Sequence, residues 1–219
     1  MTDEDSIDES RPPWQVQSVY DQIAEHFSKT RAYAWPEVEE FVADRRGQVG
    51  LDLGCGNGRH IETLLPRVEW VIGVDLSREL LNEAGARLPA QRDVSLVQAD
   101  AAALPVRTDS VDLAIYVATL HHLPDRETRV ESLAELARVL DGTALISAWS
   151  TAHDRFDADP AQPVGFDTTI DWTLPGGETV PRFYHIYGQA EFDRDLEAGG
   201  LHIERSYVSS GNCYAEVRA

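Results

Sequence analysis

The sequence has little cysteine and no long apolar run. Its cysteines, Cys55 and Cys213, lie far apart in a chain of 219 residues, which excludes a disulfide framework and leaves no ligand spacing for a structural zinc. The longest apolar stretch, from Leu113 to Leu120, is far too short to cross a bilayer. The opening MTDEDSIDES has neither the basic start nor the apolar core of an export signal. We therefore expect a soluble protein of the cytoplasm, with no membrane association and no metal of its own.

Basic charge is also scarce, and Lys29 is the one lysine. The chain carries 38 acidic and 19 basic residues, a formal net charge of −19. A charge-dense, hydrated surface suits a salt-rich cytosol, because the Debye length falls to ~3 Å at 1 M salt and self-repulsion is muted. We therefore expect a halophilic source, with an ordinary acidic enzyme as the alternative. The same balance argues against generic nucleic-acid binding through a basic surface.

The pattern along the chain predicts one α/β domain over residues 12–219, behind a disordered acidic tail at residues 1–11. Apolar positions at helical spacing predict two N-terminal helices within residues 12–46. Short apolar runs then alternate with helical patterns, which is typical of a doubly wound parallel sheet. Residues 151–181, rich in Asp, Pro, Gly and Thr, predict a loop or insertion over the active site. A last helix near residues 189–198 precedes two β-like runs that predict an antiparallel hairpin on the sheet.

A glycine-rich turn follows the first apolar strand. In Gly54-Cys55-Gly56-Asn57-Gly58 the backbone can approach a ligand without β-carbons in the way. A dinucleotide fingerprint needs a third glycine where this chain has Arg59, which disfavours a nicotinamide or flavin cofactor. With Asp52 just before it, the turn suits a ligand that has no pyrophosphate and a charged amino acid end.

Two further acids stand at strand ends. Asp75 ends the second apolar run, 19 residues beyond Gly56, where a carboxylate accepts hydrogen bonds from ribose hydroxyls. Asp100 ends the third run, and all three acids gather at the carboxyl edge of a doubly wound sheet. Taken alone, Asp75 is equally a turn residue beside Ser77, which caps the next helix. Three such signals in order favour a nucleoside site.

The runs LDLGCGNG, VIGVD, QADAAALP and VDLAIYVATLHHL resemble the successive motifs of class I S-adenosylmethionine-dependent methyltransferases. The resemblance implies a Rossmann-like, mostly parallel seven-stranded sheet with helices on both faces and an antiparallel C-terminal strand. It also implies a set of cofactor contacts. The glycine loop (Gly54, Cys55, Gly56, Asn57) would hold the methionine part of the cofactor, next to Asp52. Asp75 would bind the ribose, and Asp100 would bind the adenine amino group. Leu76 and Ala101 would line the adenine pocket, and Val117 and Ala118 would lie beside the sulfonium.

A second resemblance concerns the acceptor. The segments VYDQIAEHFSKTRAYAWPEVEEF, HHLPDRETRVESLAELARVL and RFYHIY together resemble the tRNA methyltransferases that esterify the carboxymethyl group on a wobble uridine. This similarity spans almost the whole chain. The residues on matching positions include Tyr20, Phe27, Thr30, Arg31, Trp35, His121, His122, Trp149, Tyr184, His185 and Tyr187. It implies catalytic roles for Arg31, His122 and His121, and substrate contacts for Tyr20, Trp149, Arg182, Tyr184, His185 and Tyr187.

The chemistry of a carboxylate acceptor suits these residue types. With a pKa of about 4, the acceptor is already ionised near neutrality and needs no strong base. Arg31 is the leading candidate to grip it, with His122 as a second hydrogen-bond donor, and Trp149 is the candidate for stacking on a base. Alternatively, Arg31 pairs with a surface acid, one histidine ring packs inward, and the aromatics Tyr20, Phe27 and Trp35 are core.

The third strand, Val94 to Gln98, is expected at an open sheet edge, where unpaired backbone invites another polypeptide. Enzymes of the resembled family work with a small zinc-containing activator subunit, so a heterodimer docked on this edge is expected. Eukaryotic relatives carry a longer, more basic insertion where this chain has the acidic stretch 151–181, which leaves the RNA contact open. Two alternatives remain: a small-molecule methyltransferase acting on a quinone precursor or carboxylic acid, and an inactive cofactor-binding scaffold.

Overall fold

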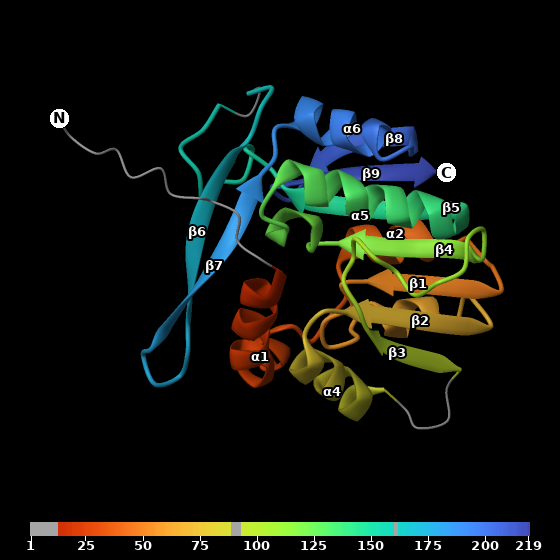
Figure 1. The fold of residues 1–219 in the computed structure, drawn as a ribbon, viewed down its shortest axis with the longest axis horizontal. Coiled ribbons are helices and arrows are strands. Elements are labelled where there is room, and N and C mark those ends of the chain that lie inside the picture. Colours follow the sequence, from red (N-terminus) through yellow and green to blue (C-terminus); the bar gives the residue numbers. More distant parts are fainter. Residues whose placement is uncertain (1–12, 89–92, 160–161) are drawn as a thin grey trace.

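A twisted sheet of seven strands forms the centre of the computed structural model, which describes residues 13–88, 93–159 and 162–219 (Figure 1). The tail predicted for residues 1–11 lies outside the described residues. The first five strands pair in parallel and the last two antiparallel, which confirms the predicted sheet. In spatial order the strands are β3 (Val94–Gln98), β2 (Trp70–Asp75), β1 (Val49–Leu53), β4 (Val111–Val117), β5 (Leu140–Trp149), β9 (Asn212–Arg218) and β8 (His202–Ser209).

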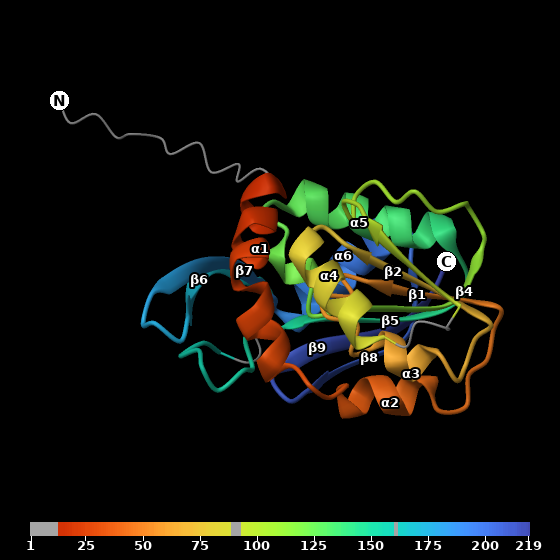
Figure 2. The same ribbon diagram turned by 90° about the horizontal axis from the view of Figure 1, so that it is seen from below.

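The central strands read as nearly continuous apolar runs because helices cover both faces of the sheet. Figure 2 shows α5 (Arg126–Val139) and α6 (Gln189–Ala198) on one face, opposite α2 (Pro36–Val42) and α3 (Ile61–Leu64). Two separate apolar clusters result, one under α5 and α6 and the other under α2, α3 and α4 (Arg78–Arg87). The sheet order reverses between β1 and β4, and this is the point where open α/β sheets bind ligands.

The first helix, α1 (Pro13–Thr30), lies beyond the carboxyl ends of the parallel strands (Figure 1). It packs against α4 and against β7 (Thr179–Ile186). Asp21 fixes it to the start of α4, because its Oδ1 accepts a hydrogen bond from the Ser77 hydroxyl at 2.6 Å. Ser77 in turn caps α4 by accepting from the backbone N–H of Leu80. The helix therefore closes one side of the ligand edge.

A second, two-stranded sheet stands apart from the first. β6 (Phe166–Thr173) and β7 pair antiparallel, and one bridge between Ser150 and Tyr187 links this hairpin to the main sheet. Residues 151–181 were predicted to form a loop or insertion, and within them residues 166–173 and 179–181 belong to the strands of this hairpin. Side chains alternate between faces: Trp172 and Arg182 share the face toward α1, and Asp167 and His185 the other. Asp, Thr and Pro obscured that alternation in the sequence.

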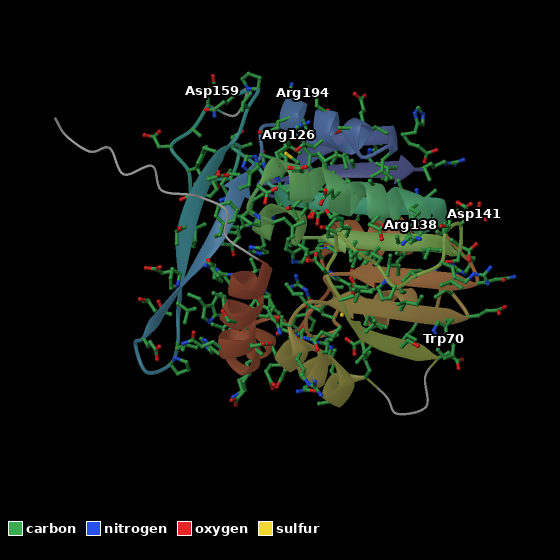
Figure 3. All side chains as sticks on the ribbon, viewed as in Figure 1. Trp70, Arg126, Arg138, Asp141, Asp159 and Arg194 are labelled. Carbon is green, nitrogen blue, oxygen red and sulfur yellow. The ribbon has the colours of Figure 1, made fainter. Side chains whose placement is uncertain are left out.

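The outer edges of the main sheet are β3 and β8. β3 pairs only with β2 among the described strands, so its predicted place at an open edge was confirmed. Trp70, at the start of β2, is 42% exposed and lies at the end of the sheet farthest from the hairpin (Figure 3). Over the residues that the structure describes, no helix combines the length and apolar character needed to span a membrane.

Candidate active site

The glycine loop turns sharply at the end of β1. Gly54, Gly56 and Gly58 have φ of 72°, 51° and 77°, which favour glycine. A β-carbon on Gly54 would lie only 2.1 Å from the hydroxyl oxygen of Thr119, just beyond β4, so this side chain leaves no room for any residue but glycine. The loop therefore presents bare backbone to the cavity, as predicted.

Asp75, at the end of β2, fastens this loop. Its Oδ2 accepts the backbone N–H of Gly56 at 2.8 Å, and its Oδ1 accepts that of Ser77 at 2.8 Å. Burial raises the pKa of Asp75 to about 6, against the opposing effect of these two hydrogen bonds. The residue lines the cavity, at the expected distance from the loop.

Asp52 lies beneath the loop, 1% exposed, and its Oδ2 has no hydrogen-bond partner among the described residues. Burial raises its pKa to about 7, while Arg59 opposes that shift. A carboxylate left without a donor is costly, so this atom is suited to receive a positively charged ligand group. The Asp52 side chain is not itself among the residues that line the cavity.

The remaining expected cofactor residues divide between lining and supporting positions. Leu76, Ala101, Val117 and Ala118 line the cavity, as do Cys55 and Asn57 of the loop. Ala118 has φ of 57°, an uncommon conformation outside glycine that turns β4 away at its end. Asp100 does not line the cavity, and its Oδ1 accepts the N–H of Ala102 at 2.9 Å. Asp100 therefore lies in a turn next to Ala101, which lines the cavity, and its contact with adenine stays a prediction.

The cavity that these residues line has an empty volume of about 1140 Å³. This volume includes space that is open to solvent, so it is an upper bound on what a ligand could fill. The backbone cradle at Gly54 and Gly56 lines the cavity and fits the ammonium end of S-adenosylmethionine, and the unpartnered Asp52 oxygen beneath the loop adds negative charge there. Arg59 also lines this end and makes no ion pair with a described carboxylate, so it can take the carboxylate of the same ligand.

At the other end the cavity is basic and aromatic. Arg31 from α1 and Arg182 from β7 both line it, with Tyr20, Trp149 and Tyr184. Among the described residues, neither guanidinium forms an ion pair with a carboxylate. Arg182 is only 7% exposed, and its Nε has no hydrogen-bond partner there. In a chain this acidic, two buried or half-buried arginines without acids mark an anion site.

Trp149 lies in an aromatic cluster at the end of β5. Its ring stacks on Tyr184, with centroids 4.8 Å apart and planes 22° from parallel, and it also contacts His153 at 4.9 Å. Both partners come from segments beyond β5, so the cluster ties the hairpin to the sheet edge. Stacking of Trp149 on a nucleobase stays a prediction.

His122 is placed differently from the prediction. Its Nδ1 donates to the carbonyl of Phe183 at 3.0 Å, since a carbonyl only accepts, and its Nε2 lies 2.7 Å from the Tyr20 hydroxyl. Burial, with a further contribution from Arg182, lowers the pKa of His122 to about 3, so the ring is neutral and Nε2 accepts from Tyr20. The expected role as hydrogen-bond donor to the acceptor was therefore wrong: its one N–H is already used.

His121 has the N–H that His122 lacks. Its Nδ1 accepts the backbone N–H of Trp149 at 3.0 Å, which puts the proton of the neutral ring on Nε2. Burial lowers the pKa of His121 well below its usual value, so the ring stays neutral. No described group pairs with Nε2, and the residue lines the cavity beside Tyr184. His121 is thus the histidine able to donate to an acceptor.

The structure does not bring His185 and Tyr187 to the cavity. His185 faces away from it, with Asp167 Oδ1 2.6 Å from Nδ1 and Glu191 Oε1 3.2 Å from Nε2. Tyr187 is fully buried, and its hydroxyl donates to Asp195 Oδ2 at 3.3 Å. Asp195 also pairs with Arg126, which Figure 3 labels on α5. Both residues hold the base of the hairpin against α6.

Sequence reasoning missed several residues of the site. Gln17, Arg59, His60 and Thr119 line the cavity, and Trp172 on β6 contacts both acceptor-side arginines. Arg59 directly follows the glycine loop, and that position alone was a usable signal. Nothing in the sequence pointed to Trp172, because its partners come from distant segments.

Comparison with known proteins finds similar methyltransferases. A family model described as a methyltransferase domain matches residues 51–146. The tRNA (carboxymethyluridine(34)-5-O)-methyltransferase ALKBH8 of Mus musculus is 40% identical over 142 residues, 64% of this chain and 20% of the mouse protein. The tRNA (carboxymethyluridine(34)-5-O)-methyltransferase of Saccharomyces cerevisiae is 34% identical over 170 residues, 76% of this chain and 59% of the yeast protein. A methyltransferase of Encephalitozoon cuniculi is 34% identical over 179 residues, 79% of this chain and 80% of that protein.

Solved structures share the fold at low sequence identity. A methyltransferase in complex with the Haloferax volcanii Trm112 methyltransferase activator superposes with a TM-score of 0.69 at 17% identity, over 93% of this chain and 97% of that chain. The DhpI–SAH complex superposes with a TM-score of 0.71 at 20% identity, over 94% of this chain and 95% of that chain.

Fold, glycine loop and strand-end acids together define a class I S-adenosylmethionine-dependent methyltransferase. Enzymes of this class methylate many different acceptors, and sequence similarity narrows the class to one family. The chain belongs to the methyltransferase family that includes the tRNA (carboxymethyluridine(34)-5-O)-methyltransferases of mouse and yeast.

Proposed function

We propose that this chain transfers a methyl group from S-adenosylmethionine to the carboxymethyl group of a wobble uridine in tRNA, giving the methyl ester. The observation that supports the proposal is a single cavity whose two ends are lined by different kinds of residue. The glycine loop and Asp75 line one end, and the unpaired guanidiniums of Arg31 and Arg182 line the other. A cationic cofactor suits the acidic end, and a carboxylate acceptor suits the basic end. The mouse and yeast relatives are named for this reaction.

For this reaction the protein mainly has to hold the acceptor carboxylate next to the methyl group. When bound, S-adenosylmethionine supplies a methyl group on a positively charged sulfur, and attack by a carboxylate oxygen breaks the carbon–sulfur bond to leave a neutral thioether. No proton moves, so no general base is required. Arg31 and Arg182 hold the carboxylate with planar guanidinium forks, and His121 donates from Nε2. Holding reactants in line in a water-poor pocket is a sufficient source of rate.

The direct test uses tRNA that carries unmethylated carboxymethyluridine, prepared from a strain without the wobble methyltransferase. The chain is incubated with methyl-labelled S-adenosylmethionine, and the tRNA nucleosides are identified by mass spectrometry. The proposal expects label only in the methyl ester of carboxymethyluridine. Label in a small carboxylic acid or quinone precursor, but not in tRNA, would instead identify a small-molecule methyltransferase. Cofactor binding without transfer to any acceptor would identify a scaffold.

We also propose that a small zinc-containing activator subunit docks on β3. The support is the open edge of that strand, whose residues Val94–Gln98 carry no charge, together with the neighbouring fold solved with a Trm112 activator. A partner with basic charge would supply the phosphate contacts that this acidic chain lacks. Co-expression with a Trm112-type protein tests the proposal. A heterodimer with higher activity is expected, and a fully active monomer that does not bind the partner would overturn it.

We place the enzyme in the cytoplasm of a salt-rich cell, where its tRNA substrate is found. The support is the net charge of −19 with one lysine. Stability and activity measured against KCl concentration test the salt requirement.

A further inference from the structure

Arg31 and Arg182 both contact the side chain of Trp172 on β6. The guanidinium carbon of Arg182 lies 4.8 Å from the ring centroid of Trp172, and that of Arg31 lies 5.6 Å from the same centroid. Arg31 comes from the end of α1, whereas Trp172 and Arg182 are diagonal neighbours on one face of the hairpin. The guanidinium groups of Arg31 and Arg182 therefore both contact the same indole ring.

Two guanidiniums this close repel each other, and the repulsion is not screened where water is scarce. Burial, followed by the charge of Arg182, lowers the pKa of Arg31. The electron-rich face of an indole offsets part of this cost, because it attracts cations. The side chains are thereby kept at the cavity, although this acidic chain offers many surface carboxylates to which a free arginine would turn.

Trp172 is itself fixed to the first helix. Its indole N–H donates to Nδ1 of His26 at 3.1 Å, and its ring packs on His26 and on Phe27, with centroids 5.5 and 5.6 Å away. Phe27 in turn stands one helical turn before Arg31 and contacts its guanidinium at 5.2 Å. The hairpin and α1 are thus joined directly beside the two arginines.

We propose that Trp172 is a positioning residue that holds Arg31 and Arg182 side by side as a two-arginine clamp for a carboxylate. The inference rests on the proposed function for the identity of the acceptor, but the clamp itself is a property of the free protein. A carboxylate between two pre-placed guanidiniums is attracted by both charges, whereas a neutral ester keeps only weaker hydrogen bonds through its carbonyl oxygen. The clamp therefore binds the anionic acceptor and releases the uncharged product.

The test compares Trp172→Leu, which removes the aromatic face, with Trp172→Phe, which keeps a face and loses only the N–H to His26. Trp172→Leu is expected to lower kcat/KM for carboxymethyl-tRNA about 10-fold, equivalent to about 1.4 kcal/mol. It is also expected to raise the inhibition constant of acetate about 10-fold. Trp172→Phe is expected to stay within about threefold of wild type in both measurements.

Two controls separate positioning from a general structural role. The affinity for S-adenosylhomocysteine is expected to stay within about twofold of wild type in both variants, because Trp172 does not line the cofactor end. Trp70→Leu removes a half-exposed indole from the far end of the sheet and is expected to leave acetate inhibition unchanged (Figure 3). The proposal is overturned if Trp172→Leu leaves acetate inhibition unchanged, if Trp172→Phe fails to restore it, or if cofactor affinity falls equally.

Failure of the clamp and failure of the proposed function give different results. If wild-type protein transfers no methyl group to carboxymethyl-tRNA, the proposed function fails. Acetate binding to the complex with S-adenosylhomocysteine still tests the clamp by calorimetry, with chloride at matched ionic strength as the reference. Tighter binding of acetate by wild type than by Trp172→Leu supports the clamp, and equal binding rejects it.

Discussion

The hydroxyl of Tyr20 on α1 lies 2.7 Å from Nε2 of His122, which follows β4, and this contact joins the first helix to the sheet edge at the acceptor side. The other ring nitrogen, Nδ1, donates a hydrogen bond to the carbonyl of Phe183. The neutral imidazole of His122 therefore links its own segment to α1 and to β7. The contact serves to shape the site and does not supply a catalytic proton.

Replacing Tyr20 with Phe leaves Nε2 of His122 buried without a donor. An unsatisfied buried acceptor costs about 1–3 kcal/mol, so urea denaturation is expected to show a loss of that size. We also expect kcat/KM for the carboxymethyl acceptor to fall about 10-fold, because Tyr20 lines the cavity. Tyr33→Phe, at a side chain 84% exposed, is the matched control and should change neither quantity. Wild-type stability in Tyr20→Phe would show that the contact is not formed.

Replacing Asp75 with Asn removes a charged acceptor from the cofactor end. Hydrogen bonds to charged groups contribute about 1.5–3 kcal/mol, so calorimetry is expected to show S-adenosylhomocysteine bound roughly 10- to 100-fold more weakly. Asp112→Asn is the matched control, since Asp112 accepts the N–H groups of Gln48 and Val49 away from the cavity. That variant should lose stability and keep its cofactor affinity. Equal affinity in wild type and Asp75→Asn would remove Asp75 from the site.

Removing the side chain of Arg31 tests the acceptor end. Arg31→Ala is expected to lower methyl transfer at least 100-fold and to leave S-adenosylhomocysteine affinity within about twofold, because one half of the anion site is lost. Arg31→Lys should recover only part of the rate, since an ammonium lacks the planar fork. Arg107→Ala, at an exposed position, controls for the loss of positive charge. Unchanged turnover in Arg31→Ala would exclude the residue from the mechanism.

The buried carboxyl of Asp52 makes stability depend on pH in a defined direction. Its pKa is about 7 in the folded protein, against an ordinary value of about 4. Between these values the folded state binds more protons than the unfolded state, so the free energy of unfolding contributed by Asp52 falls as pH rises from about 4 to 7. Asp52→Asn should be less sensitive to pH over this window and more stable than wild type at pH 8. Identical pH profiles by urea denaturation would refute the shift.

Salt should stabilise the protein, because a net charge of −19 repels itself and is screened as the Debye length shortens. We expect the melting temperature to rise steadily as KCl is increased to about 1 M, and methyl transfer to persist there. Sodium and potassium chloride should act alike if screening is the cause. Full stability and activity in dilute buffer would refute the halophilic interpretation.

The parts of the fold that the sequence predicted are those set by local chemistry. Apolar runs such as Val111–Val117 predict strands buried on both faces, and the glycines at 54 and 56 predict a turn that other residues disfavour. Asp75 could be placed because the carboxyl ends of neighbouring parallel strands meet at one edge.

The hairpin was missed although Phe166, Ile170 and Trp172 alternate with polar residues, because the Asp-, Pro- and Gly-rich sequence on both sides of each strand was interpreted as a loop. Sequence reasoning named both His121 and His122 as catalytic candidates, but it could not show which ring has an N–H left for an acceptor. The tautomer of each ring depends on a backbone group far away in the sequence, the N–H of Trp149 for one and the carbonyl of Phe183 for the other. Neither partner can be recognised before the chain is folded.

The acceptor side draws on segments from both ends of the described chain, and this has a consequence for its synthesis. Tyr20 and Arg31 leave the ribosome early, whereas Arg182 and Tyr184 follow only after the glycine loop and the parallel strands have been made. A nascent chain therefore completes its cofactor pocket before its acceptor pocket. A product truncated after β5 retains every expected cofactor-lining residue and Arg31, but it lacks Arg182 and therefore half of the two-arginine site.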